Sequence, residues 1–391
     1  MSVEHDYDLV VIGGGIHGVG VAQASAAAGQ RTLLVEERSL AAGTSSRSSK
    51  LIHGGLRYLE SGQWQLVRES LAERNLLLAL APKLVELVPF LLPIYADGQR
   101  RPWQIRAGLS IYAALANLKR EALFQRLPRR EWGELDGLEL TGLEAVFRYH
   151  DGRTDDAALV RAVARSAERL GAELALGTRL VAGRREGESW VLELASATGE
   201  RTVRACCLVN AAGPWIDQVS GRLRPIPPRP RVELVAGTHV ELDGVLEHGV
   251  YYTEASDGRG VFHVPWKGRV MVGTTETPYR GKPEELAPTE SEIEYLLATH
   301  RRYFPTREPK VVASWAGARV LPFASSRAFD RPREVHFVFD LPQRPSFVAV
   351  YGGKLTGYRL TAEKALQFLA LTLPPKTPIA RTSELPLEPA D

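Results

Sequence analysis

The chain has 391 residues, of which 44% are hydrophobic and 24% are charged, and its formal net charge is +3. This length allows two domains with ample cores, and the near balance of charge argues against a general nucleic-acid binder. Cys206 and Cys207 are the only cysteines, which excludes a disulfide framework, a CxxC redox pair and a zinc site with cysteine spacing. We therefore expect no metal centre.

No targeting or membrane-spanning segment is expected. Acidic and polar residues lead directly into the first apolar strand, and no uninterrupted apolar run reaches the about 18 residues that cross a bilayer. A cytoplasmic location is the default expectation.

Residues 7–37 have the pattern of a complete βαβ unit. An apolar strand at 9–12 leads into the turn GGGIHG, an Ala-rich helical segment follows, and a second strand at 32–35 ends at Glu36. The turn fits G-x-G-x-x-G. In this motif the first glycine permits a tight turn, the second lets a pyrophosphate approach the backbone, and the third lets helix and sheet pack closely.

The same unit defines the class of ligand. Phosphates would lie on unpaired amides at the positive end of the helix dipole, and Glu36 is placed to accept hydrogen bonds from an adenosine ribose. An acidic rather than a basic residue at this position disfavours a 2′-phosphate. The unit therefore predicts NAD or FAD.

Hydroxyl groups are concentrated in the segment that follows. Small and hydroxyl residues at 43–49 can bring donors against a flat or phosphorylated ligand, for which a nicotinamide dehydrogenase has no obvious use. Helical spacing of apolar residues over 66–80 then predicts an amphipathic helix.

Residues 105–127 combine an apolar helical face with flanking basic side chains. A basic amphipathic helix can lie on an anionic membrane, so peripheral membrane contact is one hypothesis. We favour packing of this face on the protein itself, because Pro128 and the acids Glu121 and Glu131 interrupt the helix and dilute the positive surface.

The pattern of a nucleotide-binding fold returns after residue 150. An acidic start and Gly171 bound a predicted helix, and strands follow near 174–181, 189–195 and 202–209, the last two joined by a hairpin at Thr198-Gly199. The sequence NAAGPW then follows a buried strand, and its small residues allow close approach to a dinucleotide.

A proline-rich run at 224–230 marks the crossover into a second domain. Alternating apolar and polar residues between 231 and 275 predict an antiparallel sheet, with a helix at 290–304 and further strands within 311–340. The turn Gly352-Gly353-Lys354 then precedes a final helix, which we expect to begin near Thr356.

Several motifs are spread over almost the whole chain: TSSRSSKLIHGGLRYLE followed by LVRESLAER, VNAAGPW, VGTTETPYRG, ESEIEYLL and YGGKLTGYRLTAEKAL. In sequence and in order they resemble the FAD-dependent glycerol-3-phosphate dehydrogenases, within the larger group of amino-acid-oxidase-like flavoproteins. The chain ends at Asp391, whereas the family commonly adds a helical C-terminal domain of about 100 residues. We therefore expect a truncated form that lacks this domain.

The resemblance implies an α/β fold with two domains. A Rossmann-like FAD-binding domain with a central parallel sheet would comprise 1–82, 150–225 and 345–391. An α+β substrate domain on an antiparallel sheet would comprise 83–149 and 226–344, and would cover the flavin ring and exclude water.

FAD is expected to bind non-covalently. In the resembled family the backbone near Val181 touches the adenine, and Lys354 with the amides of the final helix faces the pyrimidine edge of the flavin. The expected cofactor-binding residues are Gly13, Gly15, Ile16, Gly18, Glu36, Glu37, Thr44, Ser45, Ser46, Ser49, Lys50, Leu51, His53, Val181, Ala212, Gly213, Trp215, Gly353, Lys354, Leu355 and Thr356.

The reaction implied is oxidation of sn-glycerol 3-phosphate to dihydroxyacetone phosphate by hydride transfer to FAD, with electrons passed to quinone or another acceptor. His239 is the candidate base, Arg319 the substrate clamp and charge stabiliser, and Lys354 the flavin or alkoxide partner. Arg57, Tyr58, Arg319 and Arg333 are the expected substrate-binding residues, because arginine suits a phosphate dianion.

Departures from the family pattern keep other readings open. ARVLP replaces the family's V-R-P-L, Gly357 replaces a threonine, and VAGTH lacks a basic residue that is often present before the histidine. The alternatives are an FAD-dependent oxidase or dehydrogenase of another hydroxy acid or amine, and a non-catalytic flavin-binding protein.

Overall fold

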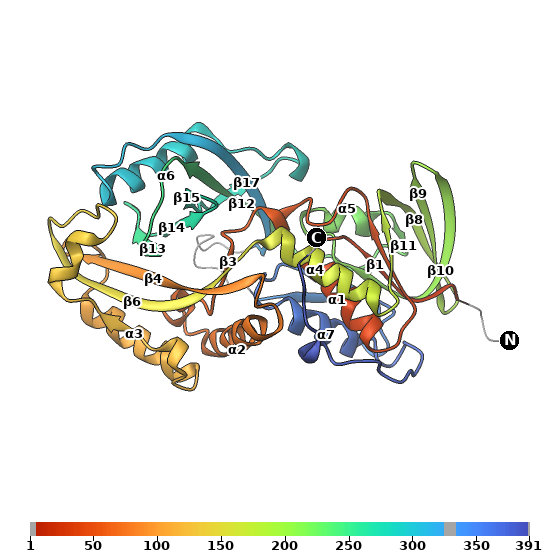
Figure 1. The fold of residues 1–391 in the computed structure, drawn as a ribbon. Helices are drawn as coiled ribbons and strands as arrows, with labels where there is room; N and C mark the ends of the chain where they lie inside the picture. Colours follow the sequence, from red (N-terminus) through yellow and green to blue (C-terminus); the bar gives the residue numbers. More distant parts are fainter. Residues whose placement is uncertain (1–4, 324–333, 390–391) are drawn as a thin grey trace.

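The computed structural model describes residues 5–323 and 334–389, and Figure 1 shows two sheets side by side, each with its own helices. Sheet A has the strand order β11-β8-β9-β10-β1-β2-β7, with β19 also beside β10 and β18 beside β19. Its strands are β1 (Tyr7–Ile12), β2 (Thr32–Glu36), β7 (Glu173–Leu176), β8 (Thr178–Glu186), β9 (Ser189–Ser196), β10 (Gly199–Asn210), β11 (Leu223–Arg224), β18 (His336–Phe339) and β19 (Phe347–Tyr351).

The centre of sheet A is parallel. Strand β1 pairs in parallel with β2 and β10, β2 with β7, and β10 with β19, while β8, β9 and β10 form an antiparallel meander. Four helices pack on this sheet, namely α1 (Ile16–Ala27), α4 (Asp156–Arg169), α5 (Ile216–Gly221) and α7 (Tyr358–Leu369).

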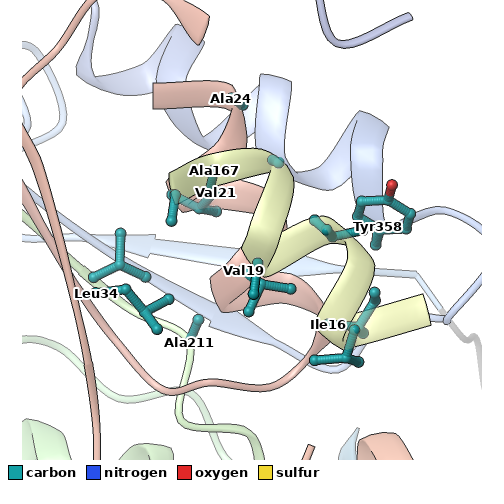
Figure 2. Close-up of a cluster of buried hydrophobic side chains, with 14 of the residues drawn as sticks. Ile16, Val19, Val21, Ala24, Leu34, Ala167, Ala211 and Tyr358 are labelled. Atoms are coloured by element: carbon teal, nitrogen blue, oxygen red, sulfur yellow. The ribbon is translucent and has the colours of Figure 1, made fainter. Parts of the chain in front are cut away.

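Alternation along β1 explains why the sheet is covered on both faces. Leu9 and Val11 belong to the core that contains α1, α4 and α7, whereas Val10 and Ile12 belong to the core on the opposite face with α5. Figure 2 shows the first of these cores, where Val19 and Leu34 lie among side chains from several elements.

One glycine allows α1 to approach β1 closely. A Cβ atom on Gly18 would lie 1.8 Å from the carbonyl oxygen of Gly13, so no other residue fits between helix and turn. The dinucleotide motif therefore specifies the packing of the first helix as well as the turn.

Sheet B is mostly antiparallel and has the order β16-β12-β15-β14-β13-β4-β6-β3, with β17 also beside β12 and β5 beside β6. Its strands are β3 (Leu51–Ile52), β4 (Val85–Tyr95), β5 (Gln125–Arg126), β6 (Leu143–Thr154), β12 (Val232–Leu242), β13 (Val250–Glu254), β14 (Gly260–Trp266), β15 (Arg269–Gly273), β16 (Thr277–Tyr279) and β17 (Val311–Pro322). Its helices are α2 (Trp64–Leu80), α3 (Pro102–Leu115) and α6 (Glu290–Tyr303).

The two faces of sheet B have different partners. Leu91 and Val240 pack in the core that contains α6, whereas the neighbouring Phe90 and Leu92 pack in the core that contains α2 and α3. Tyr112 of α3 is completely buried there. The apolar face of the predicted basic helix is thus packed on the sheet.

The predicted fold class is confirmed, with differences at several boundaries. The predicted helix after residue 150 begins only at Asp156, because residues 150–154 continue strand β6, and the final helix begins at Tyr358 rather than near Thr356. Strand β18 lies in sheet A although the sequence assigned it to the substrate domain, and β3 lies in sheet B although it was assigned to the FAD-binding domain.

Candidate functional site

A cavity of about 670 Å³ lies between the two sheets. Its walls include the segments that follow the carboxyl ends of β1, β2, β10 and β19, together with side chains from sheet B. Ligands of open α/β sheets bind outside the carboxyl ends of the strands, which is where this cavity lies.

Backbone amides orient the acid at the end of β2. The amide of Gly14 donates to Glu36 Oε2 at 2.6 Å, and the amide of Arg38 donates to Glu36 Oε1 at 2.7 Å. Ser45 Oγ accepts from the amide of Ile16 at 3.0 Å, at the first turn of α1. This end of the cavity thus combines a fixed carboxylate with the positive end of a helix, which suits a ribose next to a pyrophosphate.

Most of the expected cofactor-binding residues line the cavity. They come from five separate segments of the chain, which the fold brings to a single surface. They are Gly13, Gly15, Ile16, Glu36, Glu37, Thr44, Ser45, Ser49, Leu51, His53, Ala212, Gly213, Trp215, Gly353, Lys354, Leu355 and Thr356.

Four expected cofactor-binding residues lie elsewhere. Gly18 and Ser46 do not line the cavity, and Lys50 is buried with its Nζ on Asp156 Oδ1 at 2.5 Å. Val181 is exposed at a register irregularity of β8. Thr178 and Leu180 of the same strand line the cavity instead, because alternate side chains of a strand point to the same face.

The turn between β19 and α7 forms the opposite end of the cavity. Gly352 and Gly353 have φ angles of +74° and +97°, a left-handed conformation that favours glycine. A Cβ on Gly353 would lie 2.3 Å from Nε2 of His17, so this turn also packs on the dinucleotide motif. Lys354 and the amides before α7 face the same cavity.

We call the group Arg57, Tyr58, Glu276, Arg319 and Lys354 the substrate end of the cavity. Lys354 Nζ lies 3.7 Å, and the Arg57 guanidinium 5.2 Å, from the centroid of the Tyr58 ring. Arg319 Nη1 donates to Glu276 Oε1 at 2.9 Å. Cations on an aromatic face and an oriented guanidinium make this end suitable for an anionic ligand.

Two histidines differ in their access to the cavity. His53 lines it, and burial together with the charges of Lys354 and Arg57 lowers the pKa of His53 to about 3. Its imidazole is therefore neutral at pH 7 and can accept or donate a hydrogen bond at the wall.

His239, the expected base, lies behind the wall. It is 1% exposed, does not line the cavity, and stacks on Trp315 with ring centroids 5.6 Å apart. Ser49, which does line the cavity, is 3.0 Å from His239 Nε2. Burial, with Arg319 and Lys50 nearby, lowers the pKa of His239 to about 3. This placement argues against direct contact between His239 and a substrate. The role of His239 as the base stays a prediction.

Several cavity residues were not anticipated from the sequence. Glu276 and Arg259 contribute charge, and Tyr252 stacks on Phe262 with centroids 4.6 Å apart to form an aromatic wall. The signal for Glu276 was present in VGTTETPYRG, where the acid follows a Gly-Thr-Thr turn. Arg333, an expected substrate residue, lies outside the described residues.

The residues present fit a dinucleotide with a flavin. The cavity extends from Glu36, the acid expected to accept from a ribose, to Lys354. A Cβ on Gly13 would lie 2.6 Å from the carbonyl oxygen of Ala211, so a residue with a side chain would not fit at this position of the turn. Across the part of the chain that the structure describes, none of the helices has the length and apolar composition that crossing a membrane requires.

Comparison with known proteins supports this assignment. The family described as FAD dependent oxidoreductase matches residues 8–361. D-erythritol 1-phosphate dehydrogenase from Brucella abortus (strain 2308) is 37% identical over 382 residues, which cover 96% of this chain and 76% of that protein. Glycerol-3-phosphate dehydrogenase from Pseudomonas aeruginosa is 39% identical over 378 residues, which cover 92% of this chain and 71% of that protein.

A solved structure has the same fold. Glycerol-3-phosphate dehydrogenase from Bacillus halodurans, solved in complex with FAD, aligns with a TM-score of 0.77 and 27% identity over 97% of this chain and 67% of that chain. The resemblance stated from the sequence motifs is thereby confirmed over most of the chain.

Proposed function

This chain belongs to the family of FAD-dependent oxidoreductases, and from that premise we propose that it oxidises sn-glycerol 3-phosphate, or a closely related polyol phosphate, to the corresponding ketone. Bound FAD supplies the hydride acceptor. The observation that carries the proposal is the charge at the substrate end of the cavity. The expectation that FAD is held without a covalent bond is part of the same proposal.

The balance of charge favours a phosphate dianion. Arg57, Arg319 and Lys354 are formally positive and Glu276 is formally negative, which leaves an excess of two positive charges beside the aromatic wall. A phosphomonoester near pH 7 carries about two negative charges, whereas the carboxylate of an amino acid or hydroxy acid carries one. The fork of an arginine can bind two phosphate oxygens at once.

The side chains at this end have separate tasks in the proposed reaction. Arg57 and Arg319 bind and orient the phosphate, and the rings of Tyr58 and Tyr252 exclude water from the reacting carbon. Lys354 stabilises the alkoxide that forms as the hydroxyl proton leaves. Neutral His53 at the wall and Ser49, which connects to His239, are the groups available to receive that proton.

A dye-linked assay with purified holoenzyme tests this function. We expect turnover with sn-glycerol 3-phosphate or erythritol phosphate at a kcat/KM at least 100-fold above that for glycerol, lactate, glycine or proline. Turnover of an amine or hydroxy acid alone would support the alternative enzyme class. Flavin that none of these compounds reduces would support a non-catalytic flavoprotein.

We also propose that electrons leave to quinone at a membrane surface. Trp103, Leu118 and Leu123 are 70%, 64% and 49% exposed, on α3 and the segment after it, and the basic Arg106 and Lys119 are exposed beside them. Exposed aromatic, aliphatic and basic side chains along one segment of the chain suit the interface of an anionic bilayer. The chain would then work at the inner face of the cytoplasmic membrane.

Flotation with anionic liposomes at low salt tests the membrane proposal. The protein should co-migrate with the vesicles, and replacing Trp103 and Leu118 by Ser should reduce the bound fraction several-fold. Absence of co-migration of the unmodified protein would contradict it.

A further inference from the structure

The acid opposite Arg319 has a distinct role in the substrate end of the cavity. We infer that Glu276 is a specificity-determining residue that accepts a hydrogen bond from a substrate hydroxyl other than the one oxidised. The substrate class is then a phosphorylated polyol with a free hydroxyl beyond the reacting carbon, rather than any phosphorylated alcohol. This inference rests on the proposed function.

The first support is the position of the carboxylate. Glu276 lines the cavity, its side chain is only 6% exposed, and its Oε1 accepts from Arg319 Nη1 at 2.9 Å. A carboxylate only accepts hydrogen bonds, so its natural partner on a ligand is a donor such as a hydroxyl group. The carboxylate can also accept from a ligand hydroxyl, because a carboxylate offers about four lone-pair positions in all.

The second support is that the backbone around Glu276 is anchored. Thr275 and Thr277 each donate from Oγ1 to Glu292 Oε1 at 2.9 Å, and the carbonyl oxygen of Glu276 accepts from Arg259 Nη1 at 3.1 Å. Glu292 is buried in the first turn of α6. The residues on both sides of Glu276 are therefore tied to a helix, and the carboxylate is aimed at the cavity by a rigid support rather than by a loose loop.

The third support is the placement of Arg319, which links Glu276 to the phosphate. Strands β12 and β17 pair so that Gly237 lies opposite Gly317 and Val235 opposite Arg319. A Cβ on Gly237 would lie 3.2 Å from Arg319 Nη2 and 2.6 Å from Thr274 Oγ1, so the guanidinium lies across a glycine. With Nη1 on Glu276, the remaining N–H groups of the guanidinium can bind phosphate oxygens.

These contacts define which groups of a substrate the site recognises. The phosphate and the hydroxyl bound by Glu276 would lie on two sides of one guanidinium, a separation that a three- or four-carbon polyol phosphate spans. A carboxylate brought to Glu276 would meet a like charge, and a methyl group there would displace water without donating a hydrogen bond. Glu276 therefore selects for a hydroxyl and against both alternatives.

The test compares two substrates that differ in one hydroxyl. For glycerol 3-phosphate and propane-1,2-diol 1-phosphate we would measure kcat/KM with the unmodified holoenzyme and with Glu276→Gln, Glu276→Asp and Glu241→Gln. Glu241 pairs with Arg269 at 3.1 Å, does not line the cavity, and provides a matched control on the same sheet. Flavin absorbance and the melting temperature report whether each variant is folded and loaded.

We expect the unmodified enzyme and Glu241→Gln to prefer glycerol 3-phosphate by about 10- to 100-fold, the range of a hydrogen bond to a charged group. Glu276→Gln should reduce this preference to within threefold, and Glu276→Asp should keep part of it. Removing the negative charge of Glu276 should strengthen the binding of any anion. The ratio of the two kcat/KM values cancels this effect, because both substrates carry the same phosphate.

Two results would overturn the inference. An unchanged preference in a folded, flavin-loaded Glu276→Gln would show that this carboxylate does not bind the second hydroxyl. An equal fall in kcat for both substrates would show that it contacts the hydroxyl that reacts. Failure of the unmodified enzyme to oxidise any phosphorylated alcohol would instead remove the proposed function itself, so the two failures are distinguishable.

Discussion

Replacing Gly353 by Ala should weaken FAD binding by about two orders of magnitude. At the φ angle of +97°, the left-handed backbone costs an L-residue about 1–2 kcal/mol. The new Cβ would also lie 2.3 Å from Nε2 of His17, and displacing a packed side chain by about 1 Å costs about 1–3 kcal/mol. The sum of about 3 kcal/mol corresponds to a factor of about 100 in affinity, since the apoprotein can relax the turn whereas the FAD complex requires it.

Titration of apoprotein with FAD, followed by quenching of flavin fluorescence, measures this loss. Gly357→Ala is the matched control in the same segment, because its φ is −96° and its Cβ would meet no heavy atom within 4 Å. Adding His17→Ala to Gly353→Ala should recover the steric part, about tenfold, and leave the backbone part. Wild-type affinity in Gly353→Ala would refute the reasoning that this turn holds the flavin.

Three further predictions concern the substrate, a buried hydrogen bond and pH. Arg319→Met should raise the KM for glycerol 3-phosphate by at least tenfold, because a hydrogen bond to a charged group contributes about 1.5–3 kcal/mol; unchanged kinetics would remove Arg319 from the site. Tyr112→Phe should lower the free energy of unfolding, measured by urea denaturation, by about 1–3 kcal/mol. The buried hydroxyl donates to Asp151 at 2.6 Å and accepts from the amide of Gly54 at 2.9 Å, and phenylalanine loses both hydrogen bonds. A loss below about 0.5 kcal/mol, the size of a typical surface substitution, would contradict this prediction. The pKa of His239 is about 3 in the folded chain, below its value of about 6.5 in the unfolded chain. As the pH falls below about 6.5, His239 therefore binds a proton in the unfolded chain but not in the folded chain, which lowers stability. His239 should therefore cost about 1 kcal/mol of stability between pH 7 and 5.5, and His239→Gln should show a correspondingly shallower decline.

The dinucleotide end of the site could be predicted because its signals are local. The spacing of the glycines, the first strand and Glu36 all lie within one βαβ unit, so the turn, the helix packing and the oriented carboxylate follow from neighbouring residues. The turn at Gly352 and Gly353 is local in the same sense.

The substrate end depends on contacts that no local pattern encodes. His239 lies on the same face of its strand as Gly237 but does not line the cavity, and Ser49, which does, contacts it across 190 positions of sequence. Lys50 points to Asp156 instead of the cavity, and that acid is the first residue of α4, 106 positions later in the sequence.

Glu276 is a second residue whose surroundings depend on contacts between distant parts of the chain. In sequence it is an acid after a Gly-Thr-Thr turn, within a stretch that carries the family resemblance, and no local pattern shows which residue it faces. Strand β12 pairs with β16, which directly follows Glu276, and with β17, which carries Arg319, and these two pairings bring the acid beside the guanidinium. The register of distant strands thus determines which of many charged residues meet.

The most direct test of the account is anaerobic mixing of purified holoenzyme with sn-glycerol 3-phosphate while flavin absorbance near about 450 nm is followed. The account predicts rapid bleaching that saturates with substrate concentration and is slowed or weakened in Arg319→Met. Flavin that stays oxidised with glycerol 3-phosphate and with erythritol phosphate, yet bleaches with dithionite, would contradict the assignment of a polyol phosphate as substrate.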